Sequence, residues 1–175
     1  MKTSLALIGF MGVGKSAVGR VLSEKLGKKL VRVDFLIESR AGKSISQIFQ
    51  EDGEITFREL EIEIIKEIAS EKNRVIDCGG GIVLNSINID RLKPNAIIVW
   101  LKASSQVIAQ RTALDRQERP LLLEKRADSD IKKLIRFRKP LYQAAADINI
   151  DTSRSDILSV SEQIMRKLKK NADFS

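Results

Sequence analysis

Short apolar segments alternate with longer amphipathic segments along most of the chain. The apolar segments are rich in valine, leucine and isoleucine and span residues 3–8, 29–34, 74–78, 96–102 and 147–151. Runs of this length and composition are typical of strands buried on both faces. A helical stretch follows each of them, so the alternation predicts an α/β fold with five parallel strands and helices on both faces of the sheet.

Local signals place the main helices between these strands. Residues 16–26 form an amphipathic pattern, and residues 44–47 form a capping box for a short helix that stops at Gly53. A longer helix is expected over residues 54–71. The last helix, at about 156–170, carries cations near its C-terminal end, where they complement the helix dipole and form a solvated face.

Size and composition indicate one compact domain that spans residues 1–175. The chain is 43% hydrophobic, which is enough for a sizeable core. No apolar run approaches the length of a membrane span, and the run at 5–8 breaks at Gly9 without the features of a secretory signal. The single cysteine, Cys78, rules out an internal disulfide and agrees with a cytoplasmic location. No long apolar stripe is left over after the core helices are assigned, so we expect a monomer.

The charged and aromatic residues narrow the kinds of partner and chemistry. Thirty-one basic and 23 acidic residues give a net charge of +8, which suits either a nucleic acid or a pocket for anionic small molecules. One tyrosine and one tryptophan leave few platforms on which bases can stack, so we expect no nucleic-acid partner. The chain has no histidine, which excludes Ser–His and Cys–His nucleophile pairs and the ordinary His-bearing zinc sites. A general base is therefore expected to be a carboxylate.

The first strand leads into a phosphate-binding motif. The segment Gly9-Phe10-Met11-Gly12-Val13-Gly14-Lys15-Ser16 matches the pattern G-x-x-x-x-G-K-[ST] in full. Its glycines let the backbone curl so that successive N–H groups point at the oxygens of the β- and γ-phosphates. Lys15 adds a positive charge, the hydroxyl of Ser16 can ligate Mg²⁺, and the following helix presents the positive end of its dipole. The motif thus predicts a site for Mg-ATP.

Polar residues and glycines follow the neighbouring strands. Ligands of open parallel sheets bind beyond the carboxyl ends of the strands. The second strand is expected to end at Asp34 and the third at Asp77-Cys78-Gly79-Gly80-Gly81, so both should meet the phosphate loop in one crevice. The three glycines either let a ligand approach the backbone closely or form a tight turn from strand to helix.

Two groups of arginines are candidates for binding anions. Arg58 shares a helix face with Glu54 and Glu61. The three residues either form a ladder of ion pairs on the surface, or the two acids hold Arg58 so that it points at a bound carboxylate. The second group comprises Arg111, Arg116, Arg119, Arg126, Arg136 and Arg138. It surrounds the polar residues 115–124, and we expect a lid at about 112–124. Arginines on a lid can stabilise the charge of a transferring phosphoryl group, and a surface for RNA phosphates is the rival interpretation.

Together these motifs resemble the shikimate kinases from the phosphate loop to about Ser155, which is nearly the whole chain. Besides the loop, the segments that carry the resemblance are Asp34 with Leu36-Ile37-Glu38, Gly42-Lys43-Ser44-Ile45, Ile48-Phe49, Gly53-Glu54, Phe57-Arg58-Glu59-Leu60-Glu61, Gly79-Gly80-Gly81, Arg119-Pro120-Leu121-Leu122 and Arg138-Lys139-Pro140-Leu141-Tyr142. Several segments are weak alone, and their order and spacing together are specific. The resemblance implies transfer of the γ-phosphoryl group of ATP to the 3-hydroxyl of shikimate. The product is shikimate 3-phosphate, and the reaction is a step in aromatic amino-acid biosynthesis.

The resemblance also implies a fold and a set of site residues. The fold is a three-layer P-loop fold of the nucleoside-monophosphate-kinase type with the strand order 2-3-1-4-5, a lid, and a small helical substrate-binding region at about 34–61. For catalysis it implies Lys15, Asp34 and Arg119. For ATP it implies Gly12, Val13, Gly14, Lys15, Ser16, Ala17, Arg111, Arg119 and Arg154. For shikimate it implies Asp34, Arg58, Gly80, Gly81 and Arg138, and for Mg²⁺ it implies Ser16.

The implied roles agree with the chemistry of these side chains. Arg58 and Arg138 would grip the carboxylate of shikimate, and Glu61 would fix Arg58. Asp34 would bind substrate hydroxyls and orient or deprotonate the attacking one. The cations Lys15 and Arg119 would stabilise the transferring group.

The chain departs from the family beside the magnesium site. Arg32 stands where the family has the first acid of an Asp-x-Asp segment, which helps to hold the water shell of magnesium. A cation that faced the crevice there would repel Mg²⁺. Asp77 stands where the family usually has a small residue before the glycine triplet, and Cys78 replaces the usual serine or threonine. One hypothesis is that Asp77 supplies the missing acid, and the other is that Arg32 and Asp77 pair with each other.

Two other functions fit parts of the pattern. A kinase for another small hydroxy acid, such as gluconate, is one, because the altered surroundings of the metal leave room for it. A nucleotide-binding module without catalysis is the other. The chain retains Lys15, Asp34, Arg58, Arg119 and Arg138 together, which argues against that module because it would have no reason to keep groups for both substrate and phosphate.

Overall fold

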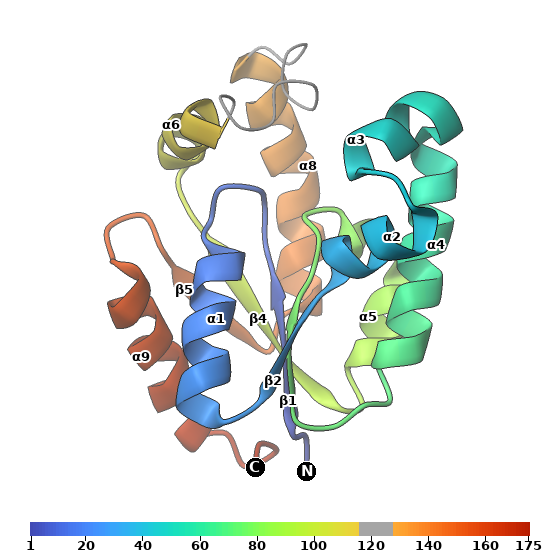
Figure 1. Cartoon of the computed structure of the whole chain (residues 1–175). Helices are drawn as coiled ribbons and strands as arrows, with labels where there is room; N and C mark the ends of the chain where they lie inside the picture. Colours follow the sequence, from blue (N-terminus) through green and yellow to red (C-terminus); the bar gives the residue numbers. More distant parts are fainter. Residues whose placement is uncertain (116–127) are drawn as a thin grey trace.

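The described residues form a sheet of five parallel strands, as the sequence predicts (Figure 1). The structure is a computed structural model that describes residues 1–115 and 128–175. The strands are β1 (Ser4–Ile8), β2 (Lys29–Arg32), β3 (Arg74–Asp77), β4 (Ala96–Lys102) and β5 (Ile148–Asp151). Their order is β2-β3-β1-β4-β5 and each neighbouring pair is parallel, which confirms the expected topology. The strand that leads into the phosphate loop, β1, therefore lies between β3 and β4.

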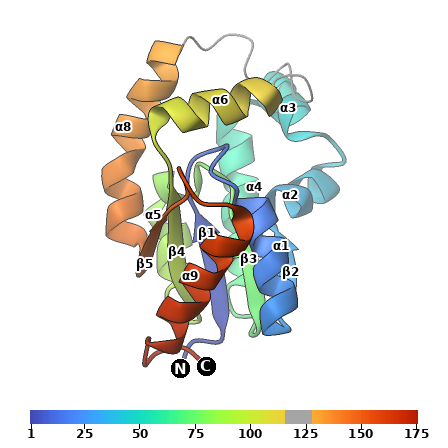
Figure 2. The same cartoon turned by 90° about the vertical axis from the view of Figure 1, so that its left-hand side faces the viewer.

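Helices connect the strands and cover both faces of the sheet (Figure 1 and Figure 2). They are α1 (Lys15–Leu26), α2 (Val33–Ala41), α3 (Ile45–Gln47), α4 (Gly53–Ile68), α5 (Ser86–Leu92), α6 (Ser105–Asp115), α8 (Asp128–Ala145) and α9 (Ile157–Lys169). A π-helical turn (Ile48–Asp52) joins α3 to α4, and a 3-10 turn (Ile82–Leu84) precedes α5. Within residues 1–115 and 128–175, no helix is both long and apolar enough to cross a membrane.

The pleat of β1 divides the apolar core into two parts. Leu5 and Leu7 belong to the core beneath α1 and α9, together with Leu22 and Ile164. The alternate residues, Ala6 and Ile8, belong to the opposite core, which α4, α5 and α8 cover. Every residue of β1 is buried. Successive side chains of a strand point to opposite faces, so a strand that is apolar throughout requires helices on both sides.

The second strand is shorter than predicted, and Asp34 is not part of it. β2 ends at Arg32 and α2 begins at Val33, so Asp34 lies in the first turn of a helix. Val33 and Ile37, four positions apart, are both fully buried. Their helical spacing overrides the strand preference of a β-branched valine. Asp34 still lies just beyond the carboxyl end of β2, where the crevice was expected.

Other boundaries differ by a few residues, as helix and strand ends commonly do. α4 ends at Ile68 rather than at residue 71, and the chain then turns through Asn73, which has a positive φ of 58°. The predicted capping box is present, because the hydroxyl of Ser44 accepts the N–H of Gln47. The short helix that it starts changes to the π-helical turn before it ends at Gly53.

Most of the predicted lid lies outside the described residues. α6 continues to Asp115, so residues 112–115 are helical, and the lid prediction beyond them, including Arg119, falls in the segment 116–127 that is not described. α6 itself lies against the phosphate loop. A β-carbon on Gly12 would lie 3.1 Å from the Cγ2 atom of Thr112 and 3.5 Å from the Cβ atom of Arg111.

Candidate active site

A cavity of about 1080 Å³ opens at the carboxyl ends of the strands. Its walls come from the loop after β1, the first turn of α2, the helix α4, the glycines after β3, and residues of α6, α8 and the loop after β5. The position confirms the crevice that strand topology predicts. A pocket for one drug-sized ligand measures about 300–1,000 Å³, so this cavity has room for two adjacent small molecules.

The loop after β1 has the curled backbone that its motif predicts. Gly9, Gly12 and Gly14 have φ values of 145°, 75° and 94°, in the region that side chains rarely adopt. At Gly9 a β-carbon would also lie 2.3 Å from the carbonyl oxygen of Leu101. The glycines of the loop are therefore required by its shape, and α1 starts directly after it with its N-terminus toward the cavity.

Lys15 lies across this loop. Its Nζ donates to the carbonyl oxygens of Gly9 at 2.9 Å and Phe10 at 3.1 Å. Desolvation lowers the pKa of Lys15, and the nearby carboxylates of Asp77 and Asp34 oppose that shift. A phosphate group bound in the loop would therefore meet the ammonium group of Lys15, whose positive charge the carboxylates of Asp77 and Asp34 favour.

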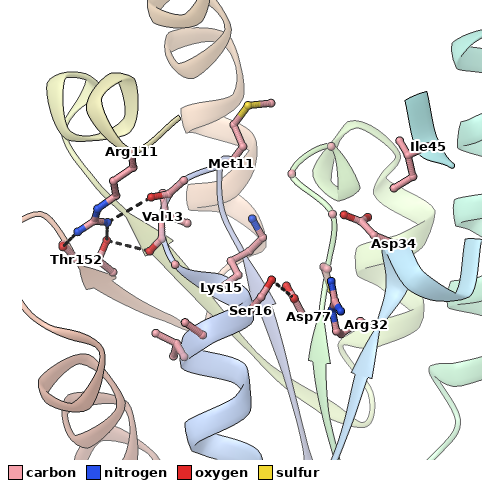
Figure 3. Close-up of a pocket in the computed structure, with 18 of the residues that line it drawn as sticks. Met11, Val13, Lys15, Ser16, Arg32, Asp34, Ile45, Asp77, Arg111 and Thr152 are labelled. Carbon is pink, nitrogen blue, oxygen red and sulfur yellow. Dashed lines mark hydrogen bonds between the residues drawn. The ribbon is translucent and has the colours of Figure 1, made fainter. Parts of the chain in front are cut away.

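Ser16 and Asp77 meet at the base of the cavity (Figure 3). The Oγ of Ser16 donates a hydrogen bond of 2.6 Å to Oδ2 of Asp77. Asp77 is 7% exposed and ends β3, the strand next to β1. Its carboxylate therefore faces the cavity and not the opposite side of the sheet.

Arg32 stands beside Asp77 in the neighbouring strand, where the two residues are in register. Its side chain is exposed and also lines the cavity. The ion pairs formed within the described part of the chain do not include one between Arg32 and Asp77. The structure thus lacks the contact that the second hypothesis about these residues requires.

Arg111 and Thr152 join α6 and the end of β5 to the phosphate loop (Figure 3). Arg111 donates to the carbonyl oxygen of Gly12 at 3.3 Å and to both oxygens of Thr152, at 3.2 and 2.9 Å. The hydroxyl of Thr152 donates in turn to the carbonyl oxygen of Val13 at 3.1 Å. Sequence reasoning missed Thr152, although its place directly after β5 satisfies the same strand-end rule that identifies the other site residues. Arg154 is exposed, and the cavity is lined by its neighbours.

Arg58 lies in the other half of the cavity. Its Nη1 donates to Oε2 of Glu61 at 3.0 Å, and its Nε and Nη2 donate to Oε1 of Glu54 at 3.3 and 3.1 Å. Glu61 is fully buried, and burial raises its pKa while the charge of Arg58 opposes that rise. A solvated ion-pair ladder does not have a buried member, so this arrangement positions Arg58.

Arg138 approaches the same half from α8. It donates to the carbonyl oxygen of Gly80 at 3.2 Å, and its guanidinium lies 5.6 Å from the ring centre of Phe10. The hydroxyl of Tyr142, one helical turn further on, donates to the same carbonyl. Burial raises the pKa of Tyr142 to about 12, so the phenol stays protonated and remains a donor.

The glycine triplet lies against these charged groups, and their close approach to its backbone explains why these three residues are glycines. A β-carbon at Gly81 would lie 2.4 Å from the guanidinium nitrogens of Arg58. A β-carbon at Gly79 would lie 2.9 Å from Oδ1 of Asp34. The triplet therefore does more than turn the chain, because it lets Arg58 and Asp34 come close to the backbone.

The cavity brings together nearly all of the site residues predicted from the sequence. Those that line it are Gly12, Val13, Gly14, Lys15, Ser16, Ala17, Asp34, Arg58, Gly80, Gly81, Arg111 and Arg138. Arg154 is adjacent to it, and Arg119 lies outside the described residues. Ile45, Phe49 and Phe57 add an apolar wall on the Arg58 side.

The fold and the site together define a P-loop kinase of the nucleoside-monophosphate-kinase type. Such a kinase needs a phosphate loop and an acceptor pocket in one cavity, and this cavity holds a Gly-Lys-Ser loop on one side and two arginines on the other.

Comparison with known proteins identifies the family. A sequence model described as shikimate kinase matches residues 11–169. A shikimate kinase from Dehalococcoides mccartyi strain BAV1 is 43% identical over 99% of this chain and 98% of its own length. One from Thermodesulfovibrio yellowstonii is 42% identical over 95% of each chain. A solved structure of a shikimate kinase from Acinetobacter baumannii in complex with shikimate has a TM-score of 0.91 and 32% identity, covering 99% of this chain and 96% of that one.

The chain belongs to the shikimate kinase family. It is thus an ATP-dependent kinase that acts on a hydroxyl group of a small molecule, and the interpretation as a nucleotide-binding module without catalysis falls away.

Proposed function

We propose that this chain transfers the γ-phosphoryl group of Mg-ATP to the 3-hydroxyl of shikimate and so serves aromatic amino-acid biosynthesis. The observation that carries the proposal is the position of Arg58 beside Gly81 and of Arg138 at the carbonyl of Gly80, in the same cavity as the phosphate loop. Two guanidinium groups at the end of one cavity suit a carboxylate ligand. The A. baumannii relative, which has the same fold, holds shikimate.

The phosphate loop binds the nucleotide. Backbone N–H groups of residues 12–17 cradle the phosphates together with the N-terminus of α1. Arg111, fixed to Gly12 and Thr152, bounds the nucleotide half beside α6, and Arg154 follows in the loop after β5. Lys15 meets the transferring phosphoryl group as a point charge, which lowers the cost of its developing negative charge.

The acceptor half orients the attacking alcohol. Arg58 and Arg138 hold the carboxylate of shikimate, and Asp34 accepts a hydrogen bond from the reacting hydroxyl. Because the chain has no histidine to act as general base, Asp34 would take up that proton as the oxygen attacks. The family resemblance adds Arg119 to the catalytic set, and this residue lies in the segment 116–127, outside the described residues.

The oxygen donors at the base of the cavity fit magnesium. The hydroxyl of Ser16 and the carboxylate of Asp77 are 2.6 Å apart, and hard oxygen ligands are what Mg²⁺ prefers. Among residues 1–115 and 128–175, no three acidic, histidine or cysteine side chains are grouped to hold a metal ion. Ser16 would therefore be the protein ligand, with phosphate oxygens and water filling the other positions. When bound, the metal would offset the negative charge of the phosphates.

We also propose that the chain works as a cytoplasmic monomer without a nucleic-acid partner. The argument against a nucleic-acid partner is that part of the net positive charge lines the cavity and suits anionic small molecules. The basic residues there are Lys15, Arg32, Arg58, Arg111 and Arg138.

A coupled assay of ADP release tests the proposed reaction. The purified chain is given Mg-ATP with shikimate, gluconate or a nucleoside monophosphate in turn. We expect turnover with shikimate, and product analysis should show one phosphate on its 3-hydroxyl. Equal or faster turnover with gluconate, or no ADP release with shikimate, contradicts the proposal.

A further inference from the structure

Two neighbouring positions at the base of the cavity carry charges that differ from those expected from the family resemblance. Arg32 at the end of β2 replaces an acid, and Asp77 at the end of β3 replaces a small residue. The two residues are partners in the parallel register of β2 and β3. β3 lies between β2 and β1, so the acid stands one strand closer to the strand that carries the phosphate loop.

The side chains at these positions differ in burial and in contacts. Asp77 is 7% exposed, and its Oδ2 accepts the hydrogen bond of 2.6 Å from Ser16. Arg32 is exposed. Asp77 also lies close enough to Lys15 to oppose the lowering of its pKa. The carboxylate thus contacts the hydroxyl of Ser16 and lies near the ammonium group of Lys15.

A carboxylate that accepts a hydrogen bond from a metal-ligating hydroxyl fixes the direction of the lone pairs on the hydroxyl oxygen. Partners of this kind orient metal ligands and raise their basicity. Many P-loop enzymes hold Mg²⁺ with the loop Ser or Thr and an Asp at the end of a neighbouring strand. Asp77 occupies that position by topology, and its hydrogen bond reaches the Oγ that would bind the metal.

We propose that Asp77 is the residue that positions Ser16 and the water shell of the nucleotide-bound Mg²⁺, and that it takes this role from the β2 position now held by Arg32. The proposal rests on the proposed function, because it requires the nucleotide to bind as its magnesium complex. Arg32 lies one strand further from the phosphate loop than Asp77. The attraction of Mg²⁺ to the nearer carboxylate then outweighs its repulsion by the guanidinium of Arg32.

Metal affinity, not activity, provides the direct test. Mn²⁺ is used as a paramagnetic probe, and its dissociation constant from the complex of the enzyme with ADP is measured by electron paramagnetic resonance. Asp77→Asn keeps the shape and a hydrogen-bond acceptor for Ser16 but removes the charge. We expect it to weaken Mn²⁺ binding by about 10- to 100-fold, the range found for outer-shell partners.

A second variant tests whether an acid on β2 can take the place of the acid on β3. Arg32→Asp combined with Asp77→Ala returns the acid to β2, and we expect it to bind Mn²⁺ more tightly than Asp77→Asn by about tenfold. Asp90→Asn, an exposed carboxylate on α5, serves as the matched control for the loss of one negative charge and should leave the affinity unchanged. Affinity for ADP in EDTA should be the same in all of these proteins.

Kinetics separate positioning from a structural role. For Asp77→Asn we expect the Mg²⁺ concentration that gives half-maximal rate to rise, and high Mg²⁺ to recover most of kcat.

Wild-type Mn²⁺ affinity in Asp77→Asn overturns the proposal, and shikimate turnover by the wild type then still supports the proposed function. If the exchange variant folds but stays as weak as Asp77→Asn, the transfer of role from the β2 position is wrong. If Asp77→Asn does not fold, Asp77→Ser, which restores a small residue at this position, takes its place, and wild-type Mn²⁺ affinity in Asp77→Ser overturns the proposal.

Discussion

At the scale of single residues, the acceptor pocket depends on two arginines that are held by different kinds of partner. Arg58 is fixed by the buried carboxylate of Glu61, whereas Arg138 is fixed by the backbone carbonyl of Gly80. A carboxylate titrates and a carbonyl does not. The two arginines therefore respond differently to substitution and to pH.

Replacing Arg138 by lysine should weaken shikimate binding alone. A hydrogen bond to a charged group contributes about 1.5–3 kcal/mol, and lysine cannot present the planar pair of donors that suits a carboxylate. We expect KM for shikimate to rise by about 10- to 100-fold, with KM for ATP nearly unchanged. Arg136→Lys, an exposed position two residues away on α8, is the control. Steady-state kinetics that show equal effects for the two variants would place Arg138 outside the pocket.

Replacing Glu61 by glutamine should change how stability depends on pH. Burial raises the pKa of Glu61, so the folded state holds this proton more tightly than the unfolded state. The free energy of unfolding then falls as pH rises from the ordinary value of 4.5 through the raised pKa, and Glu61→Gln should remove that part of the slope. Urea unfolding at a series of pH values measures it. Glu59→Gln, exposed on the same helix, should keep the wild-type slope, and equal slopes for both variants would falsify the assignment.

At the scale of elements, the strands and most helices follow from the sequence because each segment carries its own apolar period. β1, β3, β4 and β5 lie within a residue of their predicted bounds. A helical stretch after the second strand was predicted, but α2 begins at Val33, inside the predicted strand, and this changes the setting of Asp34. The first residue of α2, Val33, continues the apolar run of β2, so no local signal marks the change from strand to helix. The helix begins at Val33 because this places Ile37 in the core beneath α4, a contact that the local sequence does not reveal.

The glycine turn after β3 gives a prediction at this scale. In Gly81→Ala the added methyl group meets the guanidinium of Arg58, which is flexible and can move away. We expect a higher KM for shikimate with little loss of stability. Gly27→Ala, in the turn after α1, has no atom within 4 Å of the added carbon but a φ of 62°.

That second variant should behave in the opposite way. It should lose about 1–2 kcal/mol of stability, the cost of a left-handed conformation with a side chain, and keep its KM values. Thermal unfolding and steady-state kinetics on the same two proteins measure both quantities. A Gly81→Ala protein with unchanged KM would show that Arg58 does not need the space above the triplet.

At the scale of the whole molecule, the two halves of the cavity share one sheet, so each substrate should stabilise the entire chain. A ligand at 100 times its dissociation constant adds about 2.7 kcal/mol. For a domain of this size that is a rise in Tm of about 5–10 °C. We expect one calorimetric transition that either ADP or shikimate shifts. Arg138→Lys should lose the shift with shikimate and keep the shift with ADP, and two separate transitions would contradict a single domain.

The sequence by itself determined the class of this protein. The phosphate loop, the strand-end glycines and the spaced arginines are local patterns, and each carries its chemistry in consecutive or helically spaced residues. The tertiary structure decided which of these groups meet. Ser16 and Asp77 are 61 positions apart, and Thr152 reaches Val13 across 139. Contacts of this range depend on strand order and register, which bring distant residues together at the end of a shared sheet and leave no trace in the local sequence.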